Sequence, residues 1–244
     1  LSPKLIIELK ELLHREPELF TDLVKITTGI QRPDIEAIAV THGPGLEPTL
    51  WVGVNCAIAL SKIWNIPVIP TNHMAGHIWS VFGNDTSFTI PQPTFPMLAL
   101  LVSGAHTELV LVKDVGDYTL LGATRDDALG EAFDKVARLL YLPYPGGPKL
   151  AELAEHGTDN PDIQMARPML HSGDYDFSFS GIKTAVRNLV DQLGDVDDQT
   201  KADIAREFQN AVTDILIKKT QTALDEHNAH AVIIGGGVAA NKHI

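Results

Sequence analysis

The opening of the chain alternates helical and extended hydrophobic patterns. Residues 3–14 carry leucines at helical spacing (Leu5, Leu9, Leu12 and Leu13), which predicts an amphipathic helix with one buried stripe. A continuous apolar run at 35–41 predicts a buried strand. The pattern then predicts, in order, a turn at Gly43-Pro44-Gly45, a helix at 50–64, a short strand at 66–70 and a helix at 72–83.

A polar, proline-rich segment separates this part from the rest. Asn84 to Pro96 holds three prolines among Asn, Asp, Ser and Thr, which predicts a loop and a lobe boundary. We therefore expect a first lobe at 1–95 and a second at 96–244. For the second lobe, the pattern predicts an antiparallel meander of three strands, at 97–103, 107–112 and 118–123. It then predicts helices at 127–140, 149–156, 181–193 and 199–227, with an irregular segment at 157–176. The chain closes with a strand at 231–234 and the start of a helix at 241–244.

This order of elements predicts the α/β class. A strand meander followed by alternating helices and strands is typical of one lobe of the two-lobed actin-like ATPases, whose duplicated lobes are ribonuclease H-like. The first half has the helix-strand-helix-strand tail of such a lobe without its opening meander, and the last predicted helix stops abruptly. We therefore expect both ends to be truncated. The alternative is that the first half is a smaller, different domain.

Composition narrows the class of protein. The chain has 244 residues, 44% hydrophobic and 20% charged, which is enough to bury a core and argues against disorder. Its net charge of -12 would repel phosphate, so RNA binding would need a partner or a local basic patch. Cys56 is the single cysteine, so no internal disulfide forms. Apolar stretches fall short of the roughly 20 residues that span a bilayer, and we expect a soluble cytoplasmic protein.

Two histidines stand four positions apart in Thr71-Asn-His-Met-Ala-Gly-His77. On a helix, His73 and His77 would lie one turn apart on the same face, close enough to share a metal. Among ten histidines such a pair also arises by chance, so two solvated surface histidines are the alternative. A zinc-protease helix would need a glutamate beside the first histidine, and Met74 stands there instead.

Small residues gather at two further turns. In Leu100-Leu-Val-Ser-Gly-Ala-His-Thr107, the Ser103-Gly104-Ala105 turn would let backbone N–H groups approach an anion, with the hydroxyls of Ser103 and Thr107 as extra donors. An ordinary hairpin turn is the alternative. At 234–241 a strand enters Gly235-Gly-Gly237 and reaches Asn241, a common nucleotide-contact pattern without Walker or Rossmann spacing.

Three acidic or mixed segments have ambiguous roles. Asp134 lies on a predicted helix before Pro145-Gly-Gly-Pro148. Its carboxylate could accept hydrogen bonds from ribose hydroxyls, and Gly147 could let a sugar lie flat on the backbone. A solvated Asp is the alternative. Asp176-Phe-Ser-Phe-Ser180 alternates like a short strand with one buried face, so structural packing is favoured. Asp126, Asp127 and Glu131 could ligate a cation or begin a helix.

Together these segments resemble one family, the bacterial-type tRNA threonylcarbamoyladenosine transferases, formerly called O-sialoglycoprotein endopeptidases. Seven strings carry the resemblance in order and span nearly the whole chain: Thr41-His-Gly-Pro-Gly-Leu46, Asn72-His-Met-Ala-Gly-His77, Leu101-Val-Ser-Gly-Ala-His-Thr107, Gly130-Glu-Ala-Phe-Asp-Lys135, Tyr144-Pro-Gly-Gly-Pro148, Asp176-Phe-Ser-Phe-Ser-Gly181 and Gly236-Gly-Val-Ala-Ala-Asn241.

The resemblance implies a site and a reaction. His73 and His77 would hold one iron(II) or zinc ion per subunit. The threonylcarbamoyl group of threonylcarbamoyl-AMP would pass to the exocyclic amine of the adenosine 3′ of the tRNA anticodon. The bound metal would polarise the carbamoyl carbonyl. The residues implied to contact the adenylate are Leu101, Val102, Ser103, Gly104, Ala105, Asp134, Gly147 and Asn241.

The resemblance also implies partners and limits. Besides tRNA, we expect a paralogous dimerisation subunit and a small ATPase subunit, and no membrane. The family's Cys-Thr-Asp-Asn segment, which supplies the third metal ligand, is absent, so this chain as written could be inactive. Ala105 replaces a usual glycine, at a cost of roughly 1 kcal/mol if that position needs positive φ. The alternatives are a metallopeptidase, opposed by Met74, and a non-catalytic dimerisation scaffold, opposed by the histidine pair.

Overall fold

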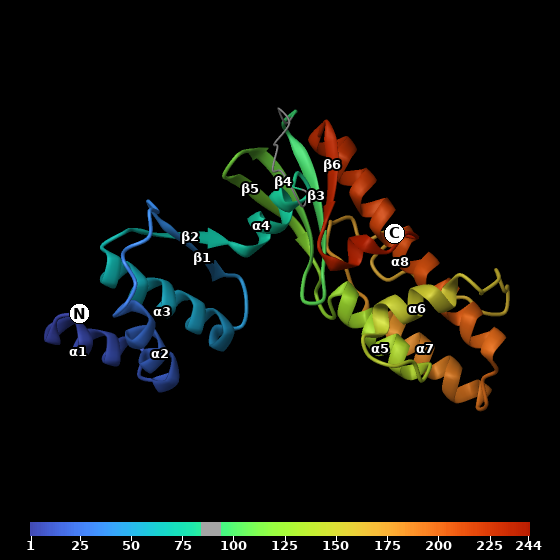
Figure 1. The fold of residues 1–244 in the computed structure, drawn as a ribbon. Coiled ribbons are helices and arrows are strands. Elements are labelled where there is room, and N and C mark those ends of the chain that lie inside the picture. Colours follow the sequence, from blue (N-terminus) through green and yellow to red (C-terminus); the bar gives the residue numbers. More distant parts are fainter. Residues whose placement is uncertain (84–93) are drawn as a thin grey trace. The chain divides into compact units, whose positions relative to one another are not determined.

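The computed structural model describes residues 1–83 and 94–244. These residues form two compact units, Leu1–Gly76 (unit 1) and His77–Ile244 (unit 2), whose elements are labelled in Figure 1. The predicted loop at 84–96 falls largely outside the described residues, and the predicted lobe boundary after residue 95 stays a prediction. None of the described helices is both long enough and apolar enough to cross a membrane.

Unit 1 is built around one βαβ element. Strands β1 (Ile38–Gly43) and β2 (Val68–Asn72) pair in parallel, and helix α3 (Glu47–Trp64) connects them. Helix α1 (Pro3–Leu12) begins where the Ser2 hydroxyl accepts the Leu5 N–H, with Pro3 in its first turn. Each element predicted for residues 3–83 is therefore present, with boundaries shifted by a few residues, but the prediction of a buried strand at 35–41 was wrong, because β1 is half-buried to exposed.

Sequence analysis missed one helix in unit 1. Helix α2 (Pro17–Thr27) packs beside α1 and buries Leu23 in a small core with Leu9 and Leu13. The signals were present in the sequence, because Pro17 occupies the first helical turn and Leu19 stands four positions before Leu23.

Unit 2 contains a four-stranded mixed sheet in the order β5-β4-β3-β6. Strands β3 (Met97–Val102), β4 (Thr107–Asp114) and β5 (Asp117–Ala123) form the predicted antiparallel meander. Strand β6 (Ala231–Gly235) returns from the end of the chain and pairs with β3 in parallel. A meander joined by a later parallel strand confirms the α/β character predicted for this half of the chain.

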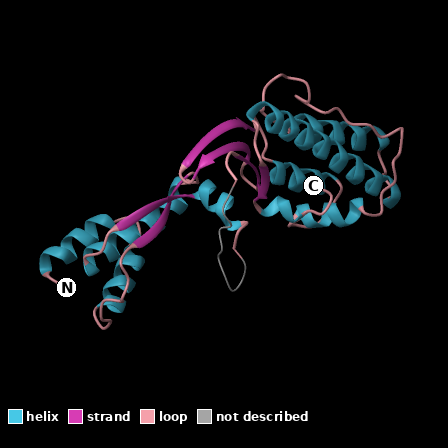
Figure 2. Ribbon diagram, turned by 90° about the horizontal axis from the view of Figure 1, so that it is seen from above, coloured by secondary structure: helices cyan, strands magenta, loops and turns pink. Residues whose placement is uncertain are grey.

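Helices cover one face of this sheet, as Figure 2 shows. They are α5 (Leu129–Leu139), α6 (Gly146–Ala154), α7 (Ser180–Leu193) and α8 (Asp198–His227). Alternate residues of β3, Leu98, Leu100 and Val102, enter the core beneath them. There Phe133 and Phe208 meet edge to face, with ring centroids 5.0 Å apart.

Helix α4 (His73–Ser80) crosses the division between the units, and its last turn contacts the other face of the unit 2 sheet. Trp79 Nε1 donates a hydrogen bond of 2.7 Å to Tyr118 Oη on β5. Tyr118 pairs with Val112, and the adjacent Leu111 belongs to the helix-covered core, so Tyr118 faces away from that core. Residues 77–80 therefore lie on the face opposite α5, α7 and α8.

Two predictions of helix position were wrong, and the first error comes from a contact distant in sequence. Helix α6 begins at Gly146 rather than 149, because Asp134 Oδ1 accepts the N–H groups of Gly146 and Gly147 at 2.9 and 3.1 Å. No helix forms at 241–244. The helical turn is instead the 3-10 helix η1 (Gly237–Ala240), after which Asn241 is extended.

Candidate functional site

A pocket of about 760 Å³ lies within unit 2, a volume that suits a nucleotide-sized ligand. Five separate segments line it: the β3–β4 turn through Gly104, α5 through Asp134, the start of α6 through Gly147, α8 through Gln209 and the end of the chain through Asn241. Four of the eight predicted adenylate contacts therefore share one cavity. Periodicity and spacing gave no sign that these distant segments meet, and only the family resemblance implied it.

The β3–β4 turn is held rigidly beside this pocket. Ser103 Oγ accepts the N–H groups of Ala105 and His106, at 3.3 and 3.0 Å. The Ser103 carbonyl accepts the N–H of Gly130 at the start of α5, at 3.1 Å. Ala105 is not among the four non-glycine residues with positive φ in the described chain, so the strain considered for it does not arise.

Asp134 organises another part of the pocket wall. Its Oδ1 accepts both N–H groups of the glycine pair, as described for the start of α6. The same residue lines the pocket, so one carboxylate joins α5, α6 and the cavity. The predicted contact of Asp134 with a ribose stays a prediction.

Asn241 reaches the pocket in a fixed orientation. Its Nδ2 donates to Gln209 Oε1 at 2.6 Å, and its Oδ1 accepts the His243 N–H at 2.9 Å. Gln209 lies on α8 with 3% of its surface exposed. Asn241, which is only partly buried, is thus hydrogen-bonded through both its amide nitrogen and its amide oxygen, and the buried Gln209 fixes its nitrogen side. Sequence analysis missed Gln209, because a glutamine inside a long helix carries no distinguishing signal.

The glycine run after β6 permits close backbone packing. Gly236 has φ of +95°, and a Cβ there would stand 2.3 Å from the Val102 carbonyl oxygen. A Cβ at Gly235 would stand 2.9 Å from the His77 carbonyl oxygen. Only glycine therefore allows the end of β6 to fit between β3 and the last turn of α4. The close approach of Gly235 and Gly236 is made to protein backbone, and the predicted nucleotide contact at this run stays a prediction.

The other predicted adenylate contacts are not among the described residues that line the pocket. Leu101 and Val102 are 1% and 0% exposed, with their side chains in the unit 2 interior. Ser103 and Ala105 belong to the turn that presents Gly104. Thr107 is completely buried, and its Oγ1 accepts the Leu129 N–H at 2.8 Å, which caps the start of α5. The adenylate roles of Leu101, Val102, Ser103 and Ala105 stay predictions.

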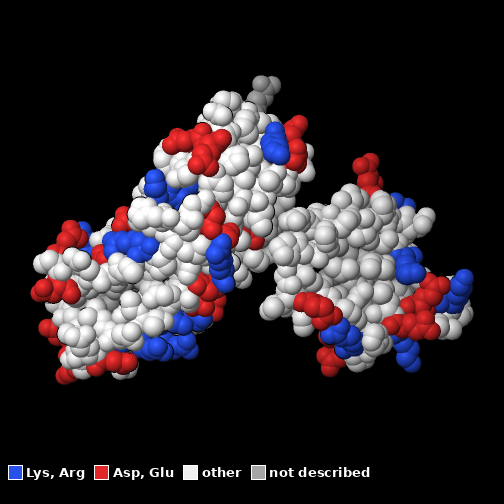
Figure 3. Space-filling view, turned by 180° about the vertical axis from the view of Figure 1, so that it is seen from behind, with Lys and Arg blue, Asp and Glu red and all other residues white. Residues whose placement is uncertain are grey.

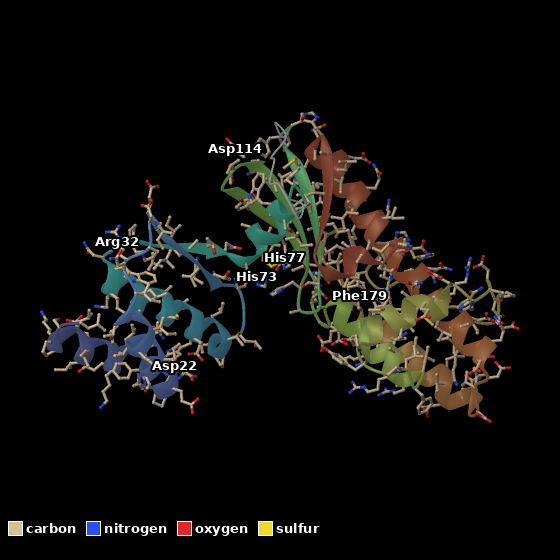
Figure 4. The ribbon with its side chains drawn as sticks, in the orientation of Figure 1. Asp22, Arg32, His73, His77, Asp114 and Phe179 are labelled. Atoms are coloured by element: carbon tan, nitrogen blue, oxygen red, sulfur yellow. The ribbon has the colours of Figure 1, made fainter. Side chains whose placement is uncertain are left out.

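Figure 4 labels the histidine pair on α4, one helical turn apart. His73 Nδ1 lies 3.3 Å from the Pro44 carbonyl oxygen. A backbone carbonyl next to one ring nitrogen is a common arrangement around metal-binding histidines. The two imidazoles thus fit a metal in donor chemistry. Residues 1–83 and 94–244 contain no group of three or more metal-ligating side chains.

The acidic cluster forms hydrogen bonds and ion pairs within the protein. Asp127 and Glu131 each lie 2.7 Å from Lys135 Nζ. Asp126 accepts hydrogen bonds from the Ser178 and Ser180 hydroxyls and from the Phe179 and Ser180 N–H groups. Burial raises the pKa of Asp126, and these hydrogen bonds outweigh it, so the pKa lies below its ordinary value. These contacts favour the structural alternative over a cation site.

The Asp176–Ser180 segment packs as predicted. Phe177 and Phe179, the latter labelled in Figure 4, are completely buried in the unit 2 core. Phe177 makes only an isolated bridge to Thr124 instead of the short strand that the alternation suggested. Asp126 holds this segment in place through the hydrogen bonds just described.

Comparison with known proteins identifies the family. A family profile described as tRNA N6-adenosine threonylcarbamoyltransferase matches residues 18–244. The chain belongs to this family. The resemblance deduced from the seven strings is thereby confirmed. Because the family has the actin-like ATPase fold, the fold class predicted from the sequence is confirmed as well.

Several curated relatives carry the family's name. The chain is 52% identical over 221 residues to the tRNA N6-adenosine threonylcarbamoyltransferase of Chromobacterium violaceum, covering 88% of this chain and 63% of the relative. It is 48% identical over 229 residues to that of Burkholderia vietnamiensis, covering 91% and 64%. The chain thus spans less than two thirds of the length of these relatives.

Solved structures give a more distant likeness. The activator of the 2-hydroxyisocaproyl-CoA dehydratase from Clostridium difficile, solved with bound ADPNP, is 14% identical, with a TM-score of 0.45 over 93% of this chain and 69% of that chain.

Proposed function

We propose that the protein transfers the threonylcarbamoyl group from threonylcarbamoyl-AMP to the exocyclic amine of the adenosine 3′ of the tRNA anticodon. The observation that carries the proposal is the pocket of about 760 Å³ in which Gly104, Asp134, Gly147 and Asn241 meet. Family membership supports the reaction, since the matching relatives are named for it.

The chemistry asks the protein mainly to bind and orient. The amine nitrogen attacks the carbamoyl carbonyl carbon, a C–N bond forms, and the C–O bond to phosphate breaks. AMP leaves with the electron pair, and the amine loses a proton to solvent. The backbone N–H of Gly104 would stabilise the phosphate, since the other N–H groups of the turn donate within it. Asn241, oriented by Gln209, would contact the ribose or base.

His73 and His77 would hold an iron(II) or zinc ion, as part of a ligand set. When bound, such an ion supplies Lewis acidity that polarises a carbonyl oxygen. The contact between His73 Nδ1 and the Pro44 carbonyl supports this role, because metal-binding imidazoles are commonly oriented by a backbone carbonyl.

The partners proposed for the reaction are tRNA, a paralogous dimerisation subunit and a small ATPase subunit. The net charge of -12 supports a need for partners, because an acidic protein gains little from the phosphate attraction that dominates RNA affinity.

Transfer can be tested apart from donor synthesis. The protein, with its partner proteins and metal, is mixed with unmodified tRNA and preformed threonylcarbamoyl-AMP, and digested nucleosides are analysed by mass spectrometry. We expect threonylcarbamoyladenosine to accumulate. Unmodified tRNA after complete consumption of the donor would contradict the proposal.

The metal role has its own test. We expect His73→Ala and His77→Ala each to weaken zinc or iron binding by at least about tenfold, measured by titration of the metal alone. His171→Ala, which removes an exposed imidazole elsewhere in the chain, is the matched control. Unchanged affinity in both pair variants would exclude the metal role and leave the transfer proposal to be judged by mass spectrometry.

A further inference from the structure

A second pocket, of about 450 Å³, adjoins the first one in unit 2. The two cavities share Gly104 and Asp134 in their walls. The second pocket is also lined by Tyr144, by Pro143 and by the basic side chain of Arg138. A ligand here would therefore lie next to whatever occupies the first pocket, separated from it by the glycine turn and one carboxylate.

Two tyrosines at this position are far more exposed than is usual for aromatic residues. Tyr144 is 87% exposed and Tyr141 is 83% exposed. Tyrosine rings ordinarily bury much of their surface, and exposed ones are enriched where a partner covers them. Both lie in the short connection between α5 and α6, so two aromatic faces stand within four residues of each other.

The backbone of Tyr141 adds a second, independent observation. Helix α5 ends with a Schellman motif, in which the Leu142 N–H donates to the Ala137 carbonyl and Tyr141 adopts φ of +62°. Glycine is the usual residue at this position, because a bulky side chain is strained there. A solvent-exposed tyrosine gains nothing within the protein that offsets this strain. Strained exposed residues of this kind concentrate at binding sites.

The charges around the pocket favour stacking over simple phosphate attraction. Lys135 is neutralised by its ion pairs with Asp127 and Glu131. Arg138 is exposed and makes no ion pair within residues 1–83 and 94–244. On the face drawn in Figure 3, acidic and basic side chains are interspersed in small groups. RNA held here would depend on aromatic contacts with one cation beside them.

We infer that the second pocket binds the acceptor nucleotide of an RNA loop, with the unpaired base stacked on Tyr144 and the adjoining phosphate near Arg138. Tyr141 offers a second face to a neighbouring base. This inference rests on the proposed function, because an acceptor amine must come within bonding distance of the carbamoyl group carried by the adenylate. The shared wall at Gly104 and Asp134 meets that requirement, and unpaired loop bases are the usual targets of aromatic stacking.

The test measures binding of a synthetic anticodon stem–loop RNA to the full protein with its partner proteins at low salt. Tyr144→Ala should raise the RNA dissociation constant by about tenfold. Tyr144→Phe keeps the aromatic face, so its dissociation constant should stay within about twofold of the wild-type value. Tyr141→Gly should weaken RNA binding by a smaller factor while raising the thermal midpoint, since it removes the strained conformation.

A matched pair of charge variants separates the pocket from general electrostatics. Arg138→Ala and Lys113→Ala each remove one exposed positive charge, and only Arg138 lines the pocket. We expect weaker RNA binding for Arg138→Ala alone. In every variant, binding of AMP to the first pocket should stay at the wild-type level.

Two outcomes overturn the inference. One is an RNA affinity that Tyr144→Ala leaves unchanged, and the other is a wild-type protein that binds no stem–loop RNA. Failure of the proposed function has a separate signature, which is the absence of modified nucleoside from the wild-type reaction with preformed donor. A wild-type protein that modifies tRNA, together with an unaffected Tyr144→Ala variant, would reject the second pocket only.

Discussion

The two compact units differ sharply in how their cores are built. Unit 1 has a two-stranded sheet and a core of Leu9, Leu13, Leu23 and Ala59, and Ile69 of its sheet is 50% exposed. Unit 2 has a four-stranded sheet in which every residue of β3 is buried. A two-stranded sheet is marginal by itself, whereas three or more strands packed on helices are stable. The nucleotide-sized pocket lies in the unit with the larger core.

Polar contacts show the same difference. In unit 2, Asp203 is 5% exposed and accepts hydrogen bonds from the Thr158 N–H and hydroxyl, from Gln199 and from Asn160. In unit 1, the ion pair between Arg15 and Glu47 lies on the surface. Buried polar networks specify one arrangement, while exposed pairs are weak and screened by salt. The comparison teaches that the unit that contains the pocket is ordered by core packing and buried hydrogen bonds, whereas unit 1 depends more on exposed contacts.

The largest expected effect comes from the unit 2 core. Phe208→Ala removes a completely buried ring that packs against Phe133, and we expect a loss of about 3–5 kcal/mol in the free energy of unfolding. Leu13→Ala, in the core of unit 1, should cost less, about 2–3 kcal/mol. The core of unit 1 is smaller, so the residues around the cavity can move to fill part of it. Chemical denaturation of both variants measures the difference. A larger loss for Leu13→Ala would break the comparison.

An intermediate effect is expected at the buried carboxylate. Asp203→Asn replaces one acceptor oxygen with a donor that faces other donors, at a cost of about 1–3 kcal/mol. Burial raises the pKa of Asp203, and the hydrogen bonds from Thr158, Gln199 and Asn160 outweigh it, so the pKa lies below the ordinary 3.8.

The lowered pKa gives this variant a pH signature. The ionised Asp203 stabilises the folded protein above pH 3.8, and that stabilisation is lost as pH falls through the lower folded-state pKa. The gap in unfolding free energy between wild type and Asp203→Asn should therefore be constant near neutral pH and shrink below about pH 3.8. A gap that widens in acid would contradict the assignment.

The smallest effects are expected at the helix-capping hydroxyls, one in each unit. Thr107→Val leaves the Leu129 N–H unsatisfied in a buried place, and we expect a loss of about 1–2 kcal/mol. Ser2→Ala removes the cap of α1 at an exposed site, where water replaces the hydroxyl, so about 0.5–1 kcal/mol is expected. Thermal unfolding of the two variants would sharpen the comparison, and equal losses would weaken it.

Local patterning was enough for much of the fold and for the family. The meander at 97–123 was predicted because its strands are apolar, short and bounded by turn residues, and the helices at 181–193 and 199–227 followed from helical periodicity. The ordered strings identified the family. Helix α2 could have been predicted from Pro17 and its leucine spacing, but the sequence analysis did not predict it.

Only the tertiary structure decided how those segments meet. Asp134 sets the start of α6, Gln209 orients Asn241, and Thr107 proves to be a buried cap rather than a surface hydroxyl. The strained turn at Tyr141 and the pocket lined by the neighbouring Leu142 and Tyr144 were equally hidden from the sequence. The physical reason is range: periodicity and turn chemistry act over a few neighbouring residues. A hydrogen bond or a cavity wall instead depends on backbone that returns from far along the chain, and one sequence read locally does not encode that distance.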